Sequence, residues 1–354
     1  MSSPTSNGLE GIVVADTAIS HVDGDRGRLV IAGSDAEQLA AAGGFEGTVQ
    51  RVLAAGGAKL DDPDLGHARV AAWEVVGRLG DALDAPDAMD ALRTSLGHLR
   101  TTGDDLRDAL AAIGAAPVFV AAWYRKRTDQ PLVGPDPTLD HASDYLRMTT
   151  GQPPSREAAT ALDAYLVTVI DHGMSASTFT ARVIASTGSD LISAIVGAVG
   201  ALKGPLHGGA PGPVLDMLDA IGEPGRAEPW ILDELAAHRR IMGMGHRIYR
   251  VRDPRAAVLE TAVRPLASKR LELARAVEHA AAKILHERKP DRPLAANVEF
   301  YTAVLLDAVG LPREQFSATF AISRIAGWSA HVIEQRRTGR LIRPASRYLG
   351  PMPA

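Results

Sequence analysis

Apolar residues recur every three or four positions along most of this chain, and this spacing limits its fold more than any other feature. The spacing predicts helices over 155–171, 180–203 and 271–286. Only 5% of the residues are aromatic, and Ala and Leu are frequent, which also favours helices over sheets. The N-terminus differs, because the β-rich stretch 12–19, the turn VDGDRG and the segment RLVIAG together predict a hairpin. We therefore expect an all-α fold with one short N-terminal β-hairpin.

Glycine and proline residues predict how the chain is divided. With 354 residues, 46% of them apolar, the chain can bury a large core and form two lobes. Glycine and proline cluster near 204–213 and again near 310–312. These clusters predict a small helical domain, 211–311, inserted in a large helical domain made of 1–210 and 312–354. Hinges of this kind often close over a substrate.

Composition makes several classes of site unexpected. The chain has no cysteine, which excludes disulfides, thiolate zinc sites and a cysteine nucleophile and agrees with a reducing cytoplasm. The histidines are scattered without HExxH spacing, so no metal site is expected. A formal charge of −4 gives no footprint for nucleic acid. No 18-residue window is purely apolar and the N-terminus has no signal-peptide pattern, so we expect a cytoplasmic protein without a membrane segment.

The stretch GPLHGGAPG, residues 204–212, places His207 among glycines and prolines. It predicts a rigid, crowded turn followed by a short helix that begins at Pro213 and stops at Gly222. The positive end of that helix would disfavour an imidazolium, and a neutral ring can donate a hydrogen bond to a carbonyl oxygen that gains charge. The alternative is a histidine that merely caps a tight turn.

A second stretch, MGMGHRIYRVRDPR at 242–255, concentrates positive charge beside His246. Like-charge repulsion makes such a concentration unfavourable unless anions relieve it. The alternative is a solvated basic loop. The arginines are Arg247, Arg250, Arg252 and Arg255.

A third stretch, ANVEFYTA at 296–303, holds Glu299 among apolar and aromatic residues. A carboxylate fixed in such surroundings can act as a base. The alternative is an exposed glutamate or an ordinary ion-pair partner.

Taken in order, these stretches resemble the citrate synthase family, and the likeness extends over nearly the whole chain. Further matching segments are GLEGIVVADTAIS, MDALRT, DHGMSASTFTAR, RIAGWSAH and LIRPASRY. The resemblance implies the citrate synthase fold, an almost wholly helical homodimer whose subunits have a large and a small domain. It also implies condensation of an acyl-CoA, usually acetyl-CoA, with oxaloacetate and hydrolysis of the thioester, with acetyl-CoA as co-substrate and no permanently bound cofactor.

The resemblance assigns roles to individual residues. It implies that His207 hydrogen-bonds the thioester carbonyl, that His246 does the same at the oxaloacetate ketone, and that Glu299 is the catalytic carboxylate. The coenzyme is linked to Arg250. The implied oxaloacetate ligands, besides His246, are His172, Arg255, Arg324 and Arg343, the last from the partner subunit.

The chain departs from the family pattern around this one site. Glu299 replaces the usual aspartate, and an added methylene moves the carboxylate oxygens by about 1 Å, which can lower a rate on the order of 10²-fold. Gly173 and Ser175 replace a glutamate and an asparagine, and Pro211 and Gly212 stand where Asn-Glu is common. Two alternatives therefore stay open: a 2-methylcitrate synthase that uses propionyl-CoA, and a weakly catalytic homologue that binds oxaloacetate or acyl-CoA.

Overall fold

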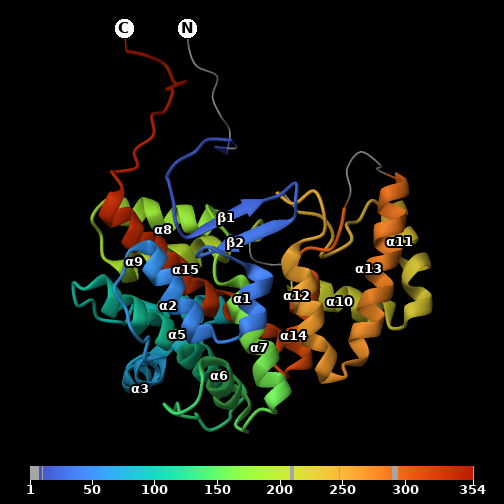
Figure 1. Cartoon of the computed structure of the whole chain (residues 1–354), viewed down its shortest axis with the longest axis horizontal. Coiled ribbons are helices and arrows are strands. Elements are labelled where there is room, and N and C mark those ends of the chain that lie inside the picture. Colours follow the sequence, from blue (N-terminus) through green and yellow to red (C-terminus); the bar gives the residue numbers. More distant parts are fainter. Residues whose placement is uncertain (1–7, 10, 208–210, 247, 289–293, 354) are drawn as a thin grey trace.

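A computed structural model describes residues 8, 9, 11–207, 211–246, 248–288 and 294–353 (Figure 1). These residues are mostly helical, as the periodicity predicts. The helices of the N-terminal half are α1 (Ala36–Ala42), α2 (Phe45–Gly56), α3 (Leu65–Val76), α4 (Ala88–Leu96), α5 (Asp105–Arg127), α6 (His141–Thr150) and α7 (Arg156–Val169). The rest are α8 (Ala176–Ser186), α9 (Leu191–Leu202), α10 (Pro211–Ile221), α11 (Ala227–Ala236), α12 (Pro254–Val263), α13 (Lys269–Arg288), α14 (Val298–Ala308) and α15 (Phe316–Thr338). Short 3₁₀ turns are η1 (Gly80–Asp84), η2 (Pro224–Arg226), η3 (Arg264–Leu266) and η4 (Arg313–Gln315).

Two long helices, α5 and α15, form the centre of the core. They pack against each other, and α5 also lies along α3 (Figure 1). By length and composition α5 could cross a membrane, yet 78% of its most apolar window is buried inside this structure. That burial is the behaviour of a core helix, because its apolar surface is already covered by other helices.

The expected hairpin is present, although its first strand begins later than predicted. Strand β1 (Ser20–Asp23) pairs antiparallel with β2 (Arg28–Ile31), in the register Ser20 to Ile31, and a two-residue strand β3 (Ser34–Asp35) adds to β2. The β-rich stretch 12–19 forms no strand, because the four residues of β2 pair with β1 on one side and two of them pair with β3 on the other. Instead, the N–H of Ala18 donates to the Glu334 side chain of α15.

The predicted helices over 155–171 and 271–286 are confirmed as α7 and α13, but the single long helix over 180–203 is wrong. The chain turns after Ser186 and continues as α9, which packs against α8. Gly188 adopts a left-handed φ of +83° at the break, and the Asp190 side chain accepts the N–H of Ser193 to begin the new helix. The apolar periodicity continues across this turn, so it could not reveal the break.

Helix α10 begins at Pro211, two residues before the predicted start, and ends at Ile221. Gly222 follows with a φ of +78°, as expected of a stop signal. Helices α10 to α14 gather on one side of the molecule (Figure 1). Helix α12 connects the two sides, since it packs against α14 on one side and against α7 on the other.

Candidate active site

Two of the predicted site residues, Arg255 and Glu299, lie where helices begin. Helix α12 starts after the cap Asp253, and α14 starts after the cap Asn297. The end of α7 leads directly into His172. Helix N-termini carry a partial positive charge, so two of them beside buried arginines favour an anionic ligand.

Glycines bring the second predicted stretch against the third. The N–H of Gly245 donates to the carbonyl of Ala295 at 2.7 Å, and the carbonyl of Gly243 accepts the N–H of Asn297 at 2.9 Å. Both glycines have left-handed φ angles, +87° and +73°, which side chains rarely adopt. The histidine of the MGMGH stretch therefore lies beside the helix that carries the predicted carboxylate.

Backbone hydrogen bonds fix the tautomer of His246. The backbone N–H groups of Ile248 and Tyr249 donate to its Nδ1 at 3.0 and 3.1 Å. Because an N–H can only donate, Nδ1 accepts and the neutral ring carries its proton on Nε2. Burial, helped by the positive charge of Arg255, lowers the pKa of His246 to about 4. At neutral pH the ring is an uncharged donor.

His207 is fixed in the opposite tautomer. The backbone N–H of Ser177 donates to its Nε2 at 3.3 Å, and the Ser177 hydroxyl lies 2.9 Å from the same nitrogen. The ring proton is thus on Nδ1. Burial and the nearby Arg324 lower the pKa of His207, so the ring is neutral as the sequence predicts. The cause expected from the sequence was the positive end of the following helix, whereas burial and Arg324 are the causes here. The three residues that join His207 to α10 lie outside the described residues.

His172 completes a group of three histidines. Its Nε2 lies 3.1 Å from the hydroxyl of Tyr249, and its ring centroid is 5.6 Å from that of His246. Burial, with the positive charges of Arg255 and Arg324, holds the pKa of His172 well below its ordinary value. Arg255 therefore acts on His172 and His246, and Arg324 acts on His172 and His207.

Arg324 and Arg255 differ in how many of their guanidinium nitrogens donate hydrogen bonds within the protein. Arg324, in the middle of α15, is 2% exposed and donates through Nε to the carbonyl of Val169 at 2.7 Å. Its Nη2 is buried and has no hydrogen-bond partner among the described residues. Arg255 uses Nε and Nη2 on the carboxylate of Asp253, at 3.0 and 2.8 Å. Burial and repulsion from Arg255 lower the pKa of Arg324 to about 10, against the attraction of Asp171. A bound anion would relieve that repulsion.

Glu299 lies at the start of α14 as the second helical residue. Its N–H donates to the side-chain oxygen of Asn297 at 3.0 Å. The carboxylate oxygen Oε2 is buried, with no hydrogen-bond partner in the described part of the chain. Burial, assisted by Asp253, raises the pKa of Glu299 to about 7, although the two buried arginines act to lower it. A carboxylate that has one buried oxygen without a partner and a pKa near neutrality has the properties of a general base.

Two predicted residues lie apart from this group. Arg343 is exposed, in the C-terminal segment that extends away from the body in Figure 1, and it borders a groove between the two terminal segments and α15. Arg250 is exposed and contacts the hairpin through its backbone N–H. Arg252 is occupied by ion pairs with Glu260 and Glu278.

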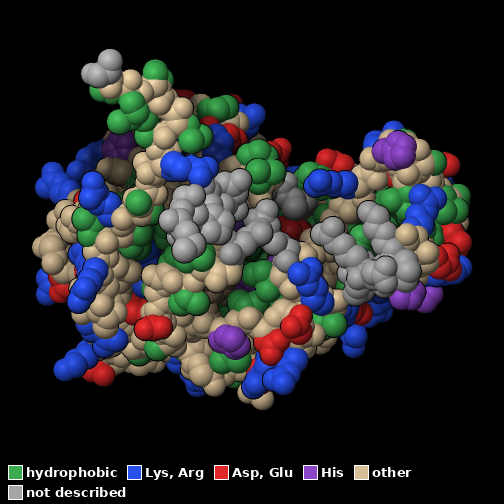
Figure 2. All heavy atoms as spheres, turned by 90° about the horizontal axis from the view of Figure 1, so that it is seen from above, with side chains coloured by type: hydrophobic (Ala, Val, Ile, Leu, Met, Phe, Trp, Pro, Cys, Tyr) green, Lys and Arg blue, Asp and Glu red, His purple; other side chains and the backbone are tan. Residues whose placement is uncertain are grey.

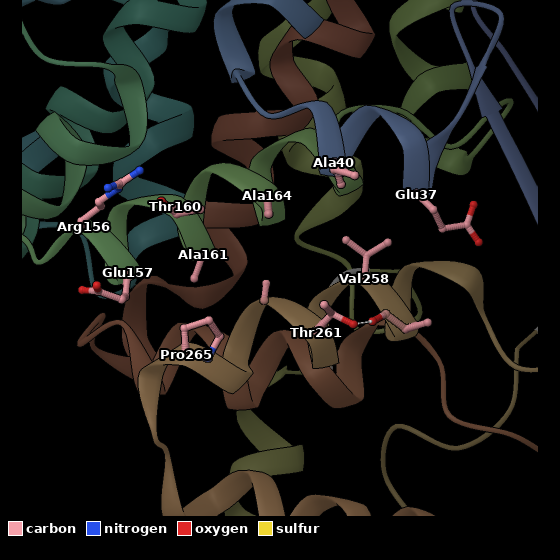
Figure 3. Close-up of a pocket in the computed structure, with 13 residues that line it drawn as sticks. Glu37, Ala40, Arg156, Glu157, Thr160, Ala161, Ala164, Val258, Thr261 and Pro265 are labelled. Atoms are coloured by element: carbon pink, nitrogen blue, oxygen red, sulfur yellow. Dashed lines mark hydrogen bonds between the residues drawn. The ribbon is translucent and has the colours of Figure 1, made fainter.

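A cavity of about 600 Å³ lies between α1, α7 and α12, and Figure 3 shows the residues that line it. Alanine and threonine side chains line most of it, with Glu37, Arg156 and Glu157 among the charged lining residues. None of the predicted site residues lines this cavity. The face seen in Figure 2 has acidic and basic side chains interspersed, in line with the small net charge.

Sequence reasoning missed several residues that hold the predicted ones. Ser177 fixes the tautomer of His207, Tyr249 contacts His172, and Asp253 pairs with Arg255. The signal for Asp253 was available, because an aspartate directly before Pro is a strong helix cap. Ser177 and Tyr249 lie within recognised motifs, but nothing in their spacing states which ring each would meet.

Comparison with known proteins decides the family. The family model described as "Citrate synthase, C-terminal domain" matches residues 8–345. The chain belongs to the citrate synthase family. It is accordingly an enzyme of acyl-transfer condensation with the helical fold of that family.

Relatives within the family carry two different names. A citrate synthase from Deinococcus radiodurans is 36% identical over 98% of this chain and 96% of its own length. A 2-methylcitrate synthase from Mycobacterium tuberculosis is 34% identical over 97% of this chain and 90% of its own. A solved citrate synthase from Thermoplasma acidophilum, in complex with carboxymethyl coenzyme A and oxaloacetate, has a TM-score of 0.88 at 27% identity and covers 100% of this chain and 98% of that one. The family is settled, and the acyl group is the open question.

Proposed function

We propose that this protein is a citrate synthase that condenses acetyl-CoA with oxaloacetate and hydrolyses the thioester to release citrate and CoA. The observation that carries the proposal is one site that combines three neutral histidines with two buried polar atoms, Nη2 of Arg324 and Oε2 of Glu299, that have no hydrogen-bond partner among the described residues. Such a set can bind an anion, remove a proton and stabilise developing charge without a metal ion.

In the first step Glu299 takes a proton from the methyl group of acetyl-CoA. That carbon is a very weak acid, so the oxygen of the thioester carbonyl must be stabilised as it gains charge. The Nδ1 proton of His207 is the donor available for this oxygen, because its Nε2 is engaged by Ser177. A neutral donor suits a forming enolate, and the pKa of His207 lies below its ordinary value.

In the second step the enolate carbon attacks the ketone of oxaloacetate. The Nε2 proton of His246 donates to the ketone oxygen as it becomes an alkoxide. Arg324 offers its unpartnered Nη2 to a substrate carboxylate, Arg255 offers the edge that Asp253 leaves free, and His172 contributes a further contact. Water then hydrolyses the thioester and releases CoA.

The proposal extends to the assembly of the enzyme. We infer a homodimer in which Arg343 reaches the oxaloacetate site of the partner subunit, which is supported by the exposure of the segment that carries it. Residues 211–311 would form the small domain, with Arg250 at the coenzyme, and the remaining chain would form the large domain. The cytoplasm is the expected location, in agreement with a cysteine-free chain.

Propionyl-CoA is the alternative acyl donor. It differs from acetyl-CoA by one methylene group, which changes binding in an apolar pocket by roughly 1 to 3 kcal/mol. The relative named 2-methylcitrate synthase, at 34% identity, is almost as similar as the citrate synthase at 36%. The proposal favours acetyl-CoA because relatives named citrate synthase, at 35 and 36% identity, are slightly more similar.

Release of CoA thiol by the purified protein tests the proposal. Oxaloacetate is supplied with either acetyl-CoA or propionyl-CoA, and Glu299→Gln and Glu299→Asp are measured in parallel. Faster turnover with acetyl-CoA that Glu299→Gln abolishes supports a citrate synthase with a glutamate base. Faster turnover with propionyl-CoA makes it a 2-methylcitrate synthase. Binding of oxaloacetate without turnover of either thioester would indicate a binding homologue.

A further inference from the structure

The N-terminal hairpin contacts the loops that carry two of the three histidines. At its root, the hydroxyl of Ser20 hydrogen-bonds the carboxylate of Asp171 and accepts the N–H of Gly173 at 2.9 Å. These two residues flank His172 in the sequence. The hairpin thus holds the side chain of the residue before His172 and the backbone of the residue after it.

The tip of the same hairpin holds the loop of the other histidine. The carbonyl of Gly24, in the turn between β1 and β2, accepts the N–H of Arg250 at 2.9 Å. Residues 248 and 249 of that loop provide the N–H groups that set the tautomer of His246. The hairpin therefore links two loops that are far apart in the chain.

The fit at the tip leaves no room for a side chain. A Cβ atom at Gly24 would lie 2.4 Å from the carbonyl oxygen of Ile248, and one at Gly27 would lie 2.5 Å from the side chain of Val251. The φ angle of Gly24 is not left-handed, so close approach alone explains a glycine there. Because the atom it would meet is backbone, the 248–252 loop would have to move.

The root of the hairpin is anchored on buried charge. Asp171 lies 3.2 Å from Nε2 of His331 on α15, and Nδ1 of that ring accepts a hydrogen bond from Arg182 at 3.1 Å. Arg182 also pairs with Glu334 of α15. All four residues are at most 4% exposed. A small sheet of short strands is marginal in water by itself, so this anchorage helps to hold the hairpin in a fixed position.

We propose that the hairpin acts as a clamp that sets the distance between His172 and His246 and thereby controls affinity for oxaloacetate. The clamp consists of Ser20 at the root and Gly24 at the tip. This inference rests on the proposed function, in which both histidines contact oxaloacetate. A displacement of about 1 Å in such a site can lower a rate on the order of 10²-fold, so loosening either end weakens the substrate site.

Gly24→Ala tests the tip, and Gly47→Ala is its matched control. Gly47 lies in α2 and is exposed, and a Cβ atom added to it would meet nothing within 4 Å. The dissociation constant of oxaloacetate is measured by isothermal titration calorimetry, which needs no turnover, and KM is measured for each substrate. We expect Gly24→Ala to raise the dissociation constant and the KM of oxaloacetate about tenfold or more. The KM of acetyl-CoA should rise less than about twofold. Gly47→Ala should match the wild type.

Ser20→Ala tests the root without adding any atom, so it avoids a steric effect on folding. It should raise the oxaloacetate constants in the same direction as Gly24→Ala. If both clamp variants bound oxaloacetate as tightly as the wild type, the inference would be overturned. It would also be overturned if the KM for oxaloacetate and the KM for acetyl-CoA changed by the same factor. If the wild-type protein neither binds oxaloacetate nor releases CoA, the proposed function is wrong. If the wild type does both, the proposed function stands and the two variants test the clamp separately from it.

Discussion

Glu299→Gln should make the folded protein more stable at alkaline pH while it removes turnover. Burial raises the pKa of Glu299 to about 7 from an ordinary 4.5, so the folded state favours the protonated carboxyl. A raised pKa gives stability that is complete below pH 4.5 and is lost as the pH rises through 7. The 2.5-unit difference corresponds to about 3 kcal/mol of lost stability at pH 8, and to less than about 1 kcal/mol at pH 5. Glutamine has no charge to bury and avoids this loss.

Chemical denaturation of the wild type and of Glu299→Gln at pH 5 and pH 8 measures the effect. The gain in unfolding free energy should approach about 3 kcal/mol at pH 8 and be small at pH 5. Glu74→Gln, at an exposed position in α3, is the control and should show no such pH dependence. If Glu299→Gln changed the free energy of unfolding equally at both pH values, or lowered it at pH 8, burial of the ionised carboxylate would not destabilise the folded state.

Three further measurements probe the same geometry. With both substrates kept well below their KM values, so that the free enzyme is titrated, the rate should fall as the pH drops below about 7, to about a tenth of its plateau at pH 6, because the base must be ionised; a flat profile between pH 6 and 8 would contradict the assignment of Glu299. Ser177→Ala should lower kcat about tenfold with little change in the oxaloacetate KM, since it weakens the contact that orients His207; steady-state kinetics measure both. Arg324→Lys should raise the oxaloacetate dissociation constant about tenfold or more in calorimetry, because an ammonium cannot reproduce the planar guanidinium; unchanged binding would remove this arginine from the site.

The helical architecture was predictable because it depends on a repeated signal. Helices α7 and α13 each keep one apolar stripe over many residues, and the structure has both. The break at Gly188 was missed because the apolar stripe continues across it. A glycine and the cap Asp190 end one helix and begin another only where the turn between them can pack against the rest of the protein, and the sequence does not show that packing. The late start of β1 has the same origin, since a strand forms only where a partner strand is present.

The candidate site was predictable in its residue types and less so in its contacts. Glycine-rich motifs predicted crowded turns, and the structure shows why Gly243 and Gly245 are needed. The tautomers of His207 and His246 depend on backbone N–H groups, whose directions no sequence pattern states. The pairing of Arg255 with Asp253 likewise leaves that arginine only part of its guanidinium for a substrate, which a count of arginines does not reveal.

The electrostatics also link the two substrates of the proposed reaction. Arg255 and Arg324 lower the pKa of Glu299 below the value that burial alone would give. Oxaloacetate brings two negative charges to these arginines, so its binding should cancel their effect and raise the pKa of the base above 7. The carboxylate becomes a stronger base only once the electrophile is in place. Binding at pH 7 should therefore take up about half a proton, which calorimetry in buffers of different ionisation enthalpy detects, and Glu299→Gln should abolish the uptake. Uptake that persists in Glu299→Gln would place the titrating group elsewhere and break the link between the arginines and the base.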